Sequence, residues 1–119
     1  MGTQDIAEQL AEYCKKGDFE TAQIELYSED VISIEQQASP MFEKETKGRN
    51  NVLNKIKKFD SMVEESFGNE VSDAIVVGNA IAFKLTMDVN MKGQDRMVMS
   101  ELCVYETKDG KVISEQFFM

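Results

Sequence analysis

The sequence predicts an α+β domain in which helices in the N-terminal half are followed by a curved, mainly antiparallel sheet. Two observations support this class. Apolar residues recur at helical spacing from Ile6 onward, and from about Asn69 they alternate with polar residues at the period of a strand. A length of 119 residues suits one domain with its own hydrophobic core. We therefore predict a single domain over residues 1–119.

The N-terminal region predicts two helices that meet at Gly17 and Asp18. Gly17 is suited to end the first helix, and Asp18 is suited to cap the start of the second. Each helix has one apolar face at helical spacing, which predicts that this face is buried. The apolar residues are Ile6, Leu10, Tyr13 and Cys14 in the first helix, and Phe19, Ala22, Leu26 and Tyr27 in the second.

The middle of the chain predicts a short strand, a loop and a third helix. Residues 31–35 are rich in β-branched side chains, residues 36–47 are polar, and Gly48 precedes the helix. Lys55 lies beside the apolar stripe of this helix, so its long side chain can reach over the apolar face. The stripe consists of Val52, Ile56, Phe59 and Val63.

The C-terminal half predicts three long strands. Apolar side chains alternate with polar ones through residues 81–91, which is the pattern of a strand buried on one face. Gly93 marks a turn, residues 96–107 form the next strand, and the final strand ends at Met119.

The loop of the final hairpin determines which side chains share a face. A two-residue loop of Asp109 and Gly110 would pair Tyr105 with Ser114, whereas a three-residue loop would pair Tyr105 with Ile113. We favour the three-residue loop, because only Gly110 then needs a positive φ angle. This choice places five side chains on one face, namely Glu101, Cys103, Tyr105, Glu115 and Phe117.

The charge and the absence of histidine exclude several function classes. The chain carries 22 acidic residues against 13 basic ones, a net charge of −9, so nucleic acid is not an expected partner. Without histidine, Ser-His-Asp and Cys-His catalysis and histidine-ligated zinc are excluded. Acid or base chemistry would rest on carboxylates, lysine or tyrosine. We expect no cofactor, and no metal, because the spacing of Glu35, Glu101 and Glu115 matches no known metal-binding loop.

The sequence also predicts the cellular setting. No stretch is apolar enough to span a membrane, and the N-terminal residues are mixed and charged, so we expect neither a membrane partner nor a signal peptide. The two cysteines, Cys14 and Cys103, lie far apart and form no CxxC pair. These features favour a reduced, cytoplasmic protein.

Several short segments share their order and character with one protein family. Two helices, a short strand, a third helix and a long antiparallel meander follow one another. The segments are Gly17-Asp18-Phe19-Glu20, Leu26-Tyr27-Ser28-Glu29-Asp30-Val31, Gly48 before a helix with Lys55, Glu101-Leu102-Cys103-Val104-Tyr105, Asp109-Gly110-Lys111-Val112-Ile113 and Glu115-Gln116-Phe117-Phe118. Over nearly the whole chain, the sequence resembles the SnoaL-like branch of the nuclear transport factor 2-like superfamily.

This resemblance implies a cone-shaped fold. Three helices would lie against the concave side of the sheet and enclose an internal pocket, and the convex side would form a homodimer. It does not imply one activity, because the fold hosts isomerases, cyclases, dehydratases, hydrolases and binding modules.

Ketosteroid isomerase uses this pocket with an Asp base, a Tyr and a protonated Asp. By resemblance, Glu35 matches the base, while Cys103 or Leu102 stands at the protonated Asp and Leu10 at the Tyr. Two of the three groups are therefore missing, so the resemblance does not imply that reaction. A reaction like that of scytalone dehydratase is also disfavoured, because it uses histidines.

Two carboxylates are the leading candidates for chemistry. Glu35 ends an apolar strand, and in a pocket its desolvated carboxylate would have a raised pKa suited to a general base; the alternative is an exposed strand end. Glu101 interrupts an apolar strand face, where a charge is costly unless it is paired, hydrogen-bonded or protonated. A buried pair between Glu101 and Lys55 would also account for it without catalysis.

Two functions remain open. In the first, the pocket binds a small, partly apolar ligand, with Lys55, Cys103, Glu115 and Phe117 as ligand-binding residues. In the second, a cofactor-free isomerase, cyclase or dehydratase acts on a carbonyl compound. Glu35 would take the proton, and Tyr105 and a protonated Glu101 or Glu115 would stabilise the enolate oxygen.

Overall fold

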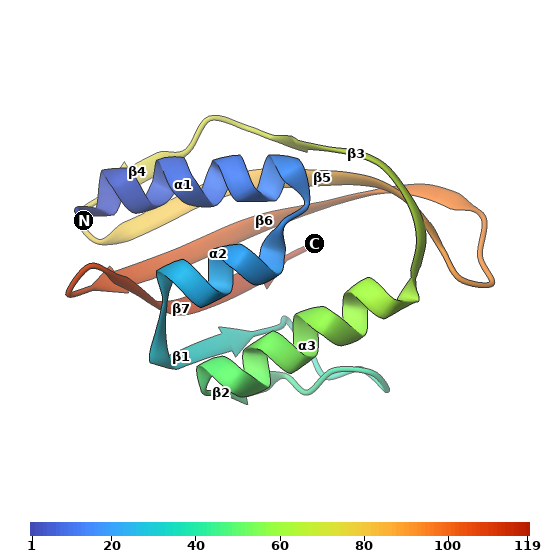
Figure 1. The fold of residues 1–119 in the computed structure, drawn as a ribbon, viewed down its shortest axis with the longest axis horizontal. Helices are drawn as coiled ribbons and strands as arrows, with labels where there is room; N and C mark the ends of the chain where they lie inside the picture. The colour runs from blue at the N-terminus through green and yellow to red at the C-terminus, as the bar shows by residue number, and fades with distance from the viewer.

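The computed structural model describes residues 1–119 and contains three helices and seven strands (Figure 1). The helices are α1 (Thr3–Lys16), α2 (Phe19–Leu26) and α3 (Arg49–Met62). The strands are β1 (Tyr27–Ile34), β2 (Glu45–Lys47), β3 (Val63–Val71), β4 (Ile75–Val77), β5 (Ala80–Met91), β6 (Arg96–Lys108) and β7 (Lys111–Phe118). The predicted α+β class and the order of the long elements are confirmed.

The junction of α1 and α2 forms as its residues predict. Gly17 adopts the left-handed conformation, with φ of 72°, and its N–H donates to the carbonyl of Cys14. The side chain of Asp18 accepts a hydrogen bond from the backbone N–H of Thr21 at 3.4 Å, so it caps α2. The sharp turn lays both helices across the same sheet.

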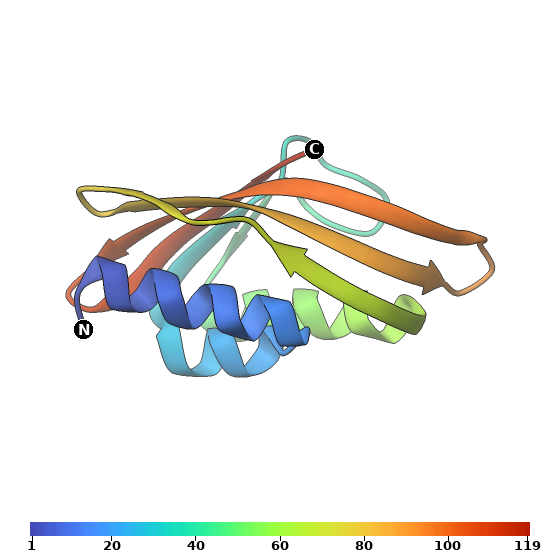
Figure 2. The same ribbon diagram turned by 90° about the horizontal axis from the view of Figure 1, so that it is seen from above.

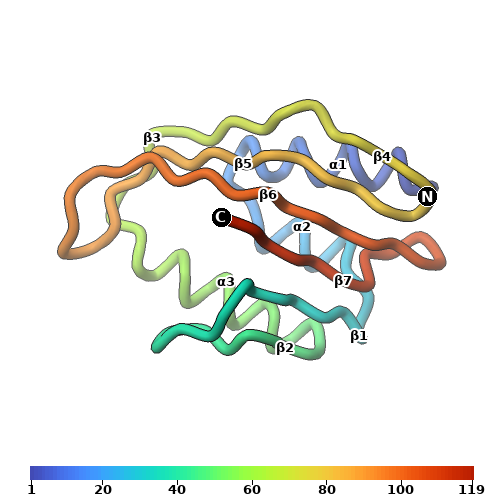
Figure 3. The backbone as a smooth tube through the Cα atoms, turned by 180° about the vertical axis from the view of Figure 1, so that it is seen from behind, coloured from blue at the N-terminus to red at the C-terminus, as the bar shows by residue number.

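The strands form one sheet in the order β2-β1-β7-β6-β5-β3, with β4 paired to β5 (Figure 3). Neighbouring strands are antiparallel except for β1 and β7, which are parallel. The parallel pair brings the first strand of the chain beside the last one. Residues near position 33 therefore lie next to residues near position 115.

All three helices lie on one face of the curved sheet, and the other face is uncovered (Figure 2). The core lies between the two layers. It takes the alternating side chains of β5 that the sequence predicted, namely Ile81, Phe83, Leu85, Met87, Val89 and Met91, together with Ile6, Leu10 and Cys14 of α1. The layered cone of the nuclear transport factor 2-like fold is thus present.

The loop of the β6–β7 hairpin differs from the predicted one, but the predicted face of the hairpin is still formed. The loop has two residues, not three, because Lys108 pairs with Lys111, and both Asp109 and Gly110 adopt positive φ angles of 52° and 77°. The register then shifts, so that Tyr105 pairs with Glu115. The extra residue of this β-bulge reverses the faces once more. The predicted shared face is restored by a feature that the sequence analysis did not foresee.

Some element boundaries also differ from expectation. Tyr27 begins β1 instead of ending α2, and Val63 begins β3 instead of extending the apolar stripe of α3. A short strand, β2, interrupts the predicted loop and pairs with β1. None of the three helices has the length and apolar character needed to cross a membrane.

Candidate functional site

A cavity of about 240 Å³ lies between the helices and the concave face of the sheet. We call it the main cavity. Of its 20 lining residues 15 are hydrophobic, so most of its surface offers only apolar contact. The lining residues that matter below are Gln23, Tyr27, Glu35, Lys55, Met87, Met99, Glu101, Tyr105, Glu115 and Phe117.

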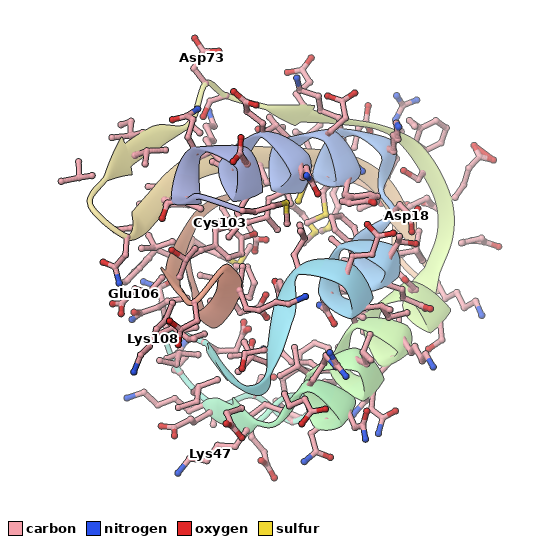
Figure 4. All side chains as sticks on the ribbon, turned by 60° about the vertical axis from the view of Figure 1, so that its left-hand side comes forward. Asp18, Lys47, Asp73, Cys103, Glu106 and Lys108 are labelled. Carbon is pink, nitrogen blue, oxygen red and sulfur yellow. The ribbon has the colours of Figure 1, made fainter.

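The structure gathers six of the seven predicted site residues at this cavity. They are Glu35, Lys55, Glu101, Tyr105, Glu115 and Phe117. Cys103 is the exception, because it is fully buried and does not line the cavity. Figure 4 shows Cys103 in the interior, whereas Glu106 and Lys108 of the same strand point outward. Cys103 therefore does not reach the cavity in which the sequence places the ligand.

Lys55 forms an ion pair with Glu35, not with Glu101. The Lys55 Nζ atom lies 2.5 Å from Oε2 of Glu35 and also donates to Oγ of Ser33 at 2.8 Å. It lies 5.6 Å from the ring centre of Phe117 as well. The apolar stripe of α3 directs the lysine stem toward the sheet, and the end of β1 supplies the carboxylate. A Lys55–Glu101 pair therefore does not explain Glu101.

Glu115 is buried and fully hydrogen-bonded. Its two carboxylate oxygens accept from the hydroxyl groups of Tyr27 and Ser33, the latter at 2.5 Å. Burial is the largest influence on this group and raises its pKa, while the two hydroxyl donors and Lys55 lower it. The parallel β1–β7 pairing places Ser33 directly beside Glu115.

Of the three carboxylates that line the cavity, Glu101 has the weakest hydrogen bonding and no ion-pair partner. Desolvation raises its pKa to about 7, and the neighbouring charge of Glu35 adds to the rise. Its side-chain hydrogen bond comes from the thiol of Cys103, at 3.7 Å between Sγ and Oε1. Glu101 therefore changes its protonation state near neutral pH, which is a property required of a general acid or base.

Tyr105 and the two cysteines form a buried group beside Glu101. Burial raises the pKa of Tyr105 well above its ordinary value, and it raises the pKa of the Cys14 thiol to about 12. The pKa of Cys103 is raised still further, by burial and by Glu101. The thiols therefore stay protonated at neutral pH and are poor nucleophiles.

Three polar residues of the site were not predicted from the sequence. Tyr27 was assigned only to an apolar helix face, and Ser33 was not singled out at all, yet both hold Glu115. Gln23 lines the cavity from α2 and is 5% exposed. The signal available for Gln23 was its position beside the apolar stripe of its helix, between Ala22 and Leu26.

Fold and site together define a small α+β protein with an internal, carboxylate-containing cavity. The model of the SnoaL-like domain matches residues 1–119, so the chain belongs to the SnoaL-like family. Comparison with curated protein sequences finds no match.

Solved structures share the fold. A protein of Mesorhizobium loti, provisionally described as a SnoaL-like polyketide cyclase, is 28% identical, with 100% of each chain covered and a TM-score of 0.90. A Catenulispora acidiphila protein with a ketosteroid isomerase-like fold, in complex with trimethylamine, is 14% identical, with 96% of this chain and 84% of that one covered and a TM-score of 0.76. TerC, co-crystallised with polyporic acid, is 13% identical, with 99% and 92% covered and a TM-score of 0.78.

Proposed function

We propose that the main cavity binds a small, largely apolar molecule. The observation that carries this proposal is the lining, in which 15 of 20 residues are hydrophobic around a volume of about 240 Å³. Small-molecule sites are typically concave and apolar, with a few polar groups that orient the ligand. TerC, a protein of the same fold that was co-crystallised with a small organic molecule, supports the proposal that the cavity binds a ligand.

A cavity-filling variant tests this binding. We expect 1-methylindole, a neutral aromatic probe, to bind the wild-type protein in isothermal titration calorimetry. Ala22→Phe adds a ring at the cavity wall and should weaken binding at least about tenfold, because filled volume cannot admit the probe. Ile24→Phe is the matched control, since Ile24 is exposed on the same helix. Equal binding by the Ala22 and Ile24 variants, or no binding by the wild type, would contradict the proposal.

A second candidate function is proton transfer to and from a small carbonyl compound. It is favoured by Glu101, whose carboxyl group has a pKa of about 7 inside an apolar cavity. In this proposal Glu101 exchanges the proton and Tyr105 donates a hydrogen bond to the carbonyl oxygen. Glu35, held beside Lys55, is the alternative base.

Deuterium uptake by 1-indanone in heavy water, followed by NMR, tests the enzymatic candidate. Catalysis predicts that wild-type protein accelerates exchange at the carbon beside the carbonyl and that Glu101→Gln removes most of the acceleration. Glu106→Gln is the matched control, because Glu106 lies on the same strand and is exposed. If wild-type protein does not accelerate exchange, binding alone remains as the proposed function; equal acceleration by wild type and Glu101→Gln would exclude Glu101 and leave Glu35 as the base.

We also propose that the uncovered face of the sheet binds a second copy of the chain. Leu102 and Phe118 lie directly opposite each other on β6 and β7 and are 44% and 36% exposed. Val98, further along β6, is 67% exposed. The positions directly opposite on β5 are charged, because Lys84 pairs with Leu102 and Asp88 pairs with Val98. Exposed apolar side chains on a sheet face without helices suit self-association, whereas the net charge of −9 opposes contact between copies at acidic surfaces.

Light scattering at micromolar concentration tests the dimer. We expect the mass of two chains for the wild type and of one chain for Leu102→Glu, which places a charge at the centre of the interface. Ile24→Glu, on the helical side, should remain dimeric. A wild-type mass of one chain would overturn this proposal.

A further inference from the structure

Gln23 combines two features: the residue lines the main cavity, and its side chain carries a buried hydrogen-bond acceptor without a partner. Gln23 is only 5% exposed, and it lines the cavity from α2. Its Oε1 atom is the one buried side-chain oxygen or nitrogen in the chain without a hydrogen-bond partner. Burying an unpaired acceptor destabilises a protein, so native structures rarely retain one without a reason.

The charged groups of the cavity give a second constraint on its ligand. Lys55 is the only cationic residue in the lining, against Glu35, Glu101 and Glu115. Its ammonium group is already engaged by Glu35 and Ser33. An anionic ligand would find no free cation and would face a surplus of carboxyl groups, so its desolvation would not be compensated.

We infer that the ligand is a neutral, largely apolar compound carrying a hydroxyl or N–H group that donates a hydrogen bond to Oε1 of Gln23. This inference rests on the proposed binding function and adds the chemical class of the ligand. The apolar wall contacts the body of the molecule, and Gln23 fixes its orientation, as single polar groups do in otherwise apolar sites. Gln23 is thus a specificity-determining residue.

Three matched probes test the inference by isothermal titration calorimetry. Indole is neutral and has one N–H donor, 1-methylindole has the same shape without the donor, and indole-3-carboxylate is an anion. We expect indole to bind about fivefold more tightly than 1-methylindole, the effect of one neutral hydrogen bond. Indole-3-carboxylate should bind more weakly than both neutral probes.

The variant Gln23→Met tests whether Gln23 causes the preference for indole over 1-methylindole. Methionine keeps the length of the side chain but removes the acceptor, so indole affinity should fall about fivefold while 1-methylindole affinity stays unchanged. The melting temperature of the unliganded variant should stay equal or rise, because an unpaired polar group has been removed from the interior. The variant leaves Ser33 and Lys55 unchanged, so the hydrogen bond from Ser33 to Glu115 should persist and serves as an internal control for the fold.

The outcomes separate this inference from the proposed function. Equal wild-type affinities for indole and 1-methylindole would overturn the role of Gln23 while leaving an apolar ligand site. Tighter binding of indole-3-carboxylate would overturn the neutral class. Failure of all three probes to bind would instead contradict the proposed function itself. The comparison of probes on the wild type holds even if a variant fails to fold.

Discussion

The ammonium group of Lys55 lies 2.5 Å from the carboxylate of Glu35, and this contact sets the charge balance of the main cavity. The two side chains are 13% and 26% exposed, so the pair is largely shielded from water. Because the lysine is engaged at the end of β1, Glu101 on β6 has no ion-pair partner. The raised pKa of Glu101, to about 7, follows mainly from its burial.

Breaking the Lys55–Glu35 pair should destabilise the fold. We expect Lys55→Met to lower the free energy of unfolding by about 2 kcal/mol, because Glu35 and Ser33 lose a partner in a partly buried site. It should also raise the pKa of Glu101, which Lys55 lowers. Urea unfolding measures the first effect and NMR titration the second. Lys57→Met, at an exposed position of the same helix, should change neither; equal effects of the two variants would contradict the assignment.

The buried carboxyl groups should make the protein less stable as pH rises. The folded-state pKa of Glu101, about 7, lies above the ordinary value of 4.5, so the folded state retains a proton that the unfolded state releases. Stability is therefore lost as pH rises from about 4.5 to 7, by about 3 kcal/mol at most for this group. The raised pKa of Glu115 acts in the same direction.

Glu101→Gln isolates this contribution. Glutamine does not ionise, so urea unfolding of the variant should show a smaller loss of stability between about pH 5 and pH 8 than the wild type. Glu106→Gln, at an exposed position of the same strand, should retain the wild-type pH dependence. An unchanged pH dependence in Glu101→Gln would mean that Glu101 is solvated in the folded protein.

Removal of one donor should weaken the Glu115 network. Tyr27→Phe deletes the hydroxyl that donates to the buried carboxylate of Glu115, and we expect a loss of about 1–3 kcal/mol in unfolding free energy. The pKa of Glu115 should rise further, since that hydrogen bond lowers it. Tyr13→Phe is the matched control, because Tyr13 donates to Glu25 at the surface. Similar stability for both variants would argue against a buried network.

The sequence predicted the elements and the shared face of the site, because both depend on periodicity. Alternation in β5 and the position of Lys55 beside the α3 stripe are local patterns, and the structure follows them. The hairpin shows the limit of such reasoning. The Asp109-Gly110 dipeptide is a local signal for the observed two-residue loop with two positive φ angles, although the other loop was favoured. The β-bulge after Val112 depends on how β7 meets β1 and β6, which no local pattern encodes.

The partners of the buried polar groups could not be predicted, because they are set by long-range pairing. Ser33 meets Glu115 only through the parallel β1–β7 contact. Lys55 meets Glu35 instead of Glu101 because α3 packs beside β1, with Val52 and the stem of Lys55 directed inward. The position of Gln23 beside the apolar stripe of α2 indicates burial, but it does not distinguish an amide that lines a cavity from one that packs elsewhere.

Methyl NMR on protein labelled with ¹³C at its methionine methyl groups tests directly whether the main cavity is the ligand site. Met87 and Met99 line the cavity, whereas Met1 and Met97 lie outside it. On titration with indole, we expect saturable shifts at Met87 and Met99 and unchanged signals at Met1 and Met97. Shifts of equal size at all four methyl groups, or none at Met87 and Met99, would contradict a ligand site in the main cavity.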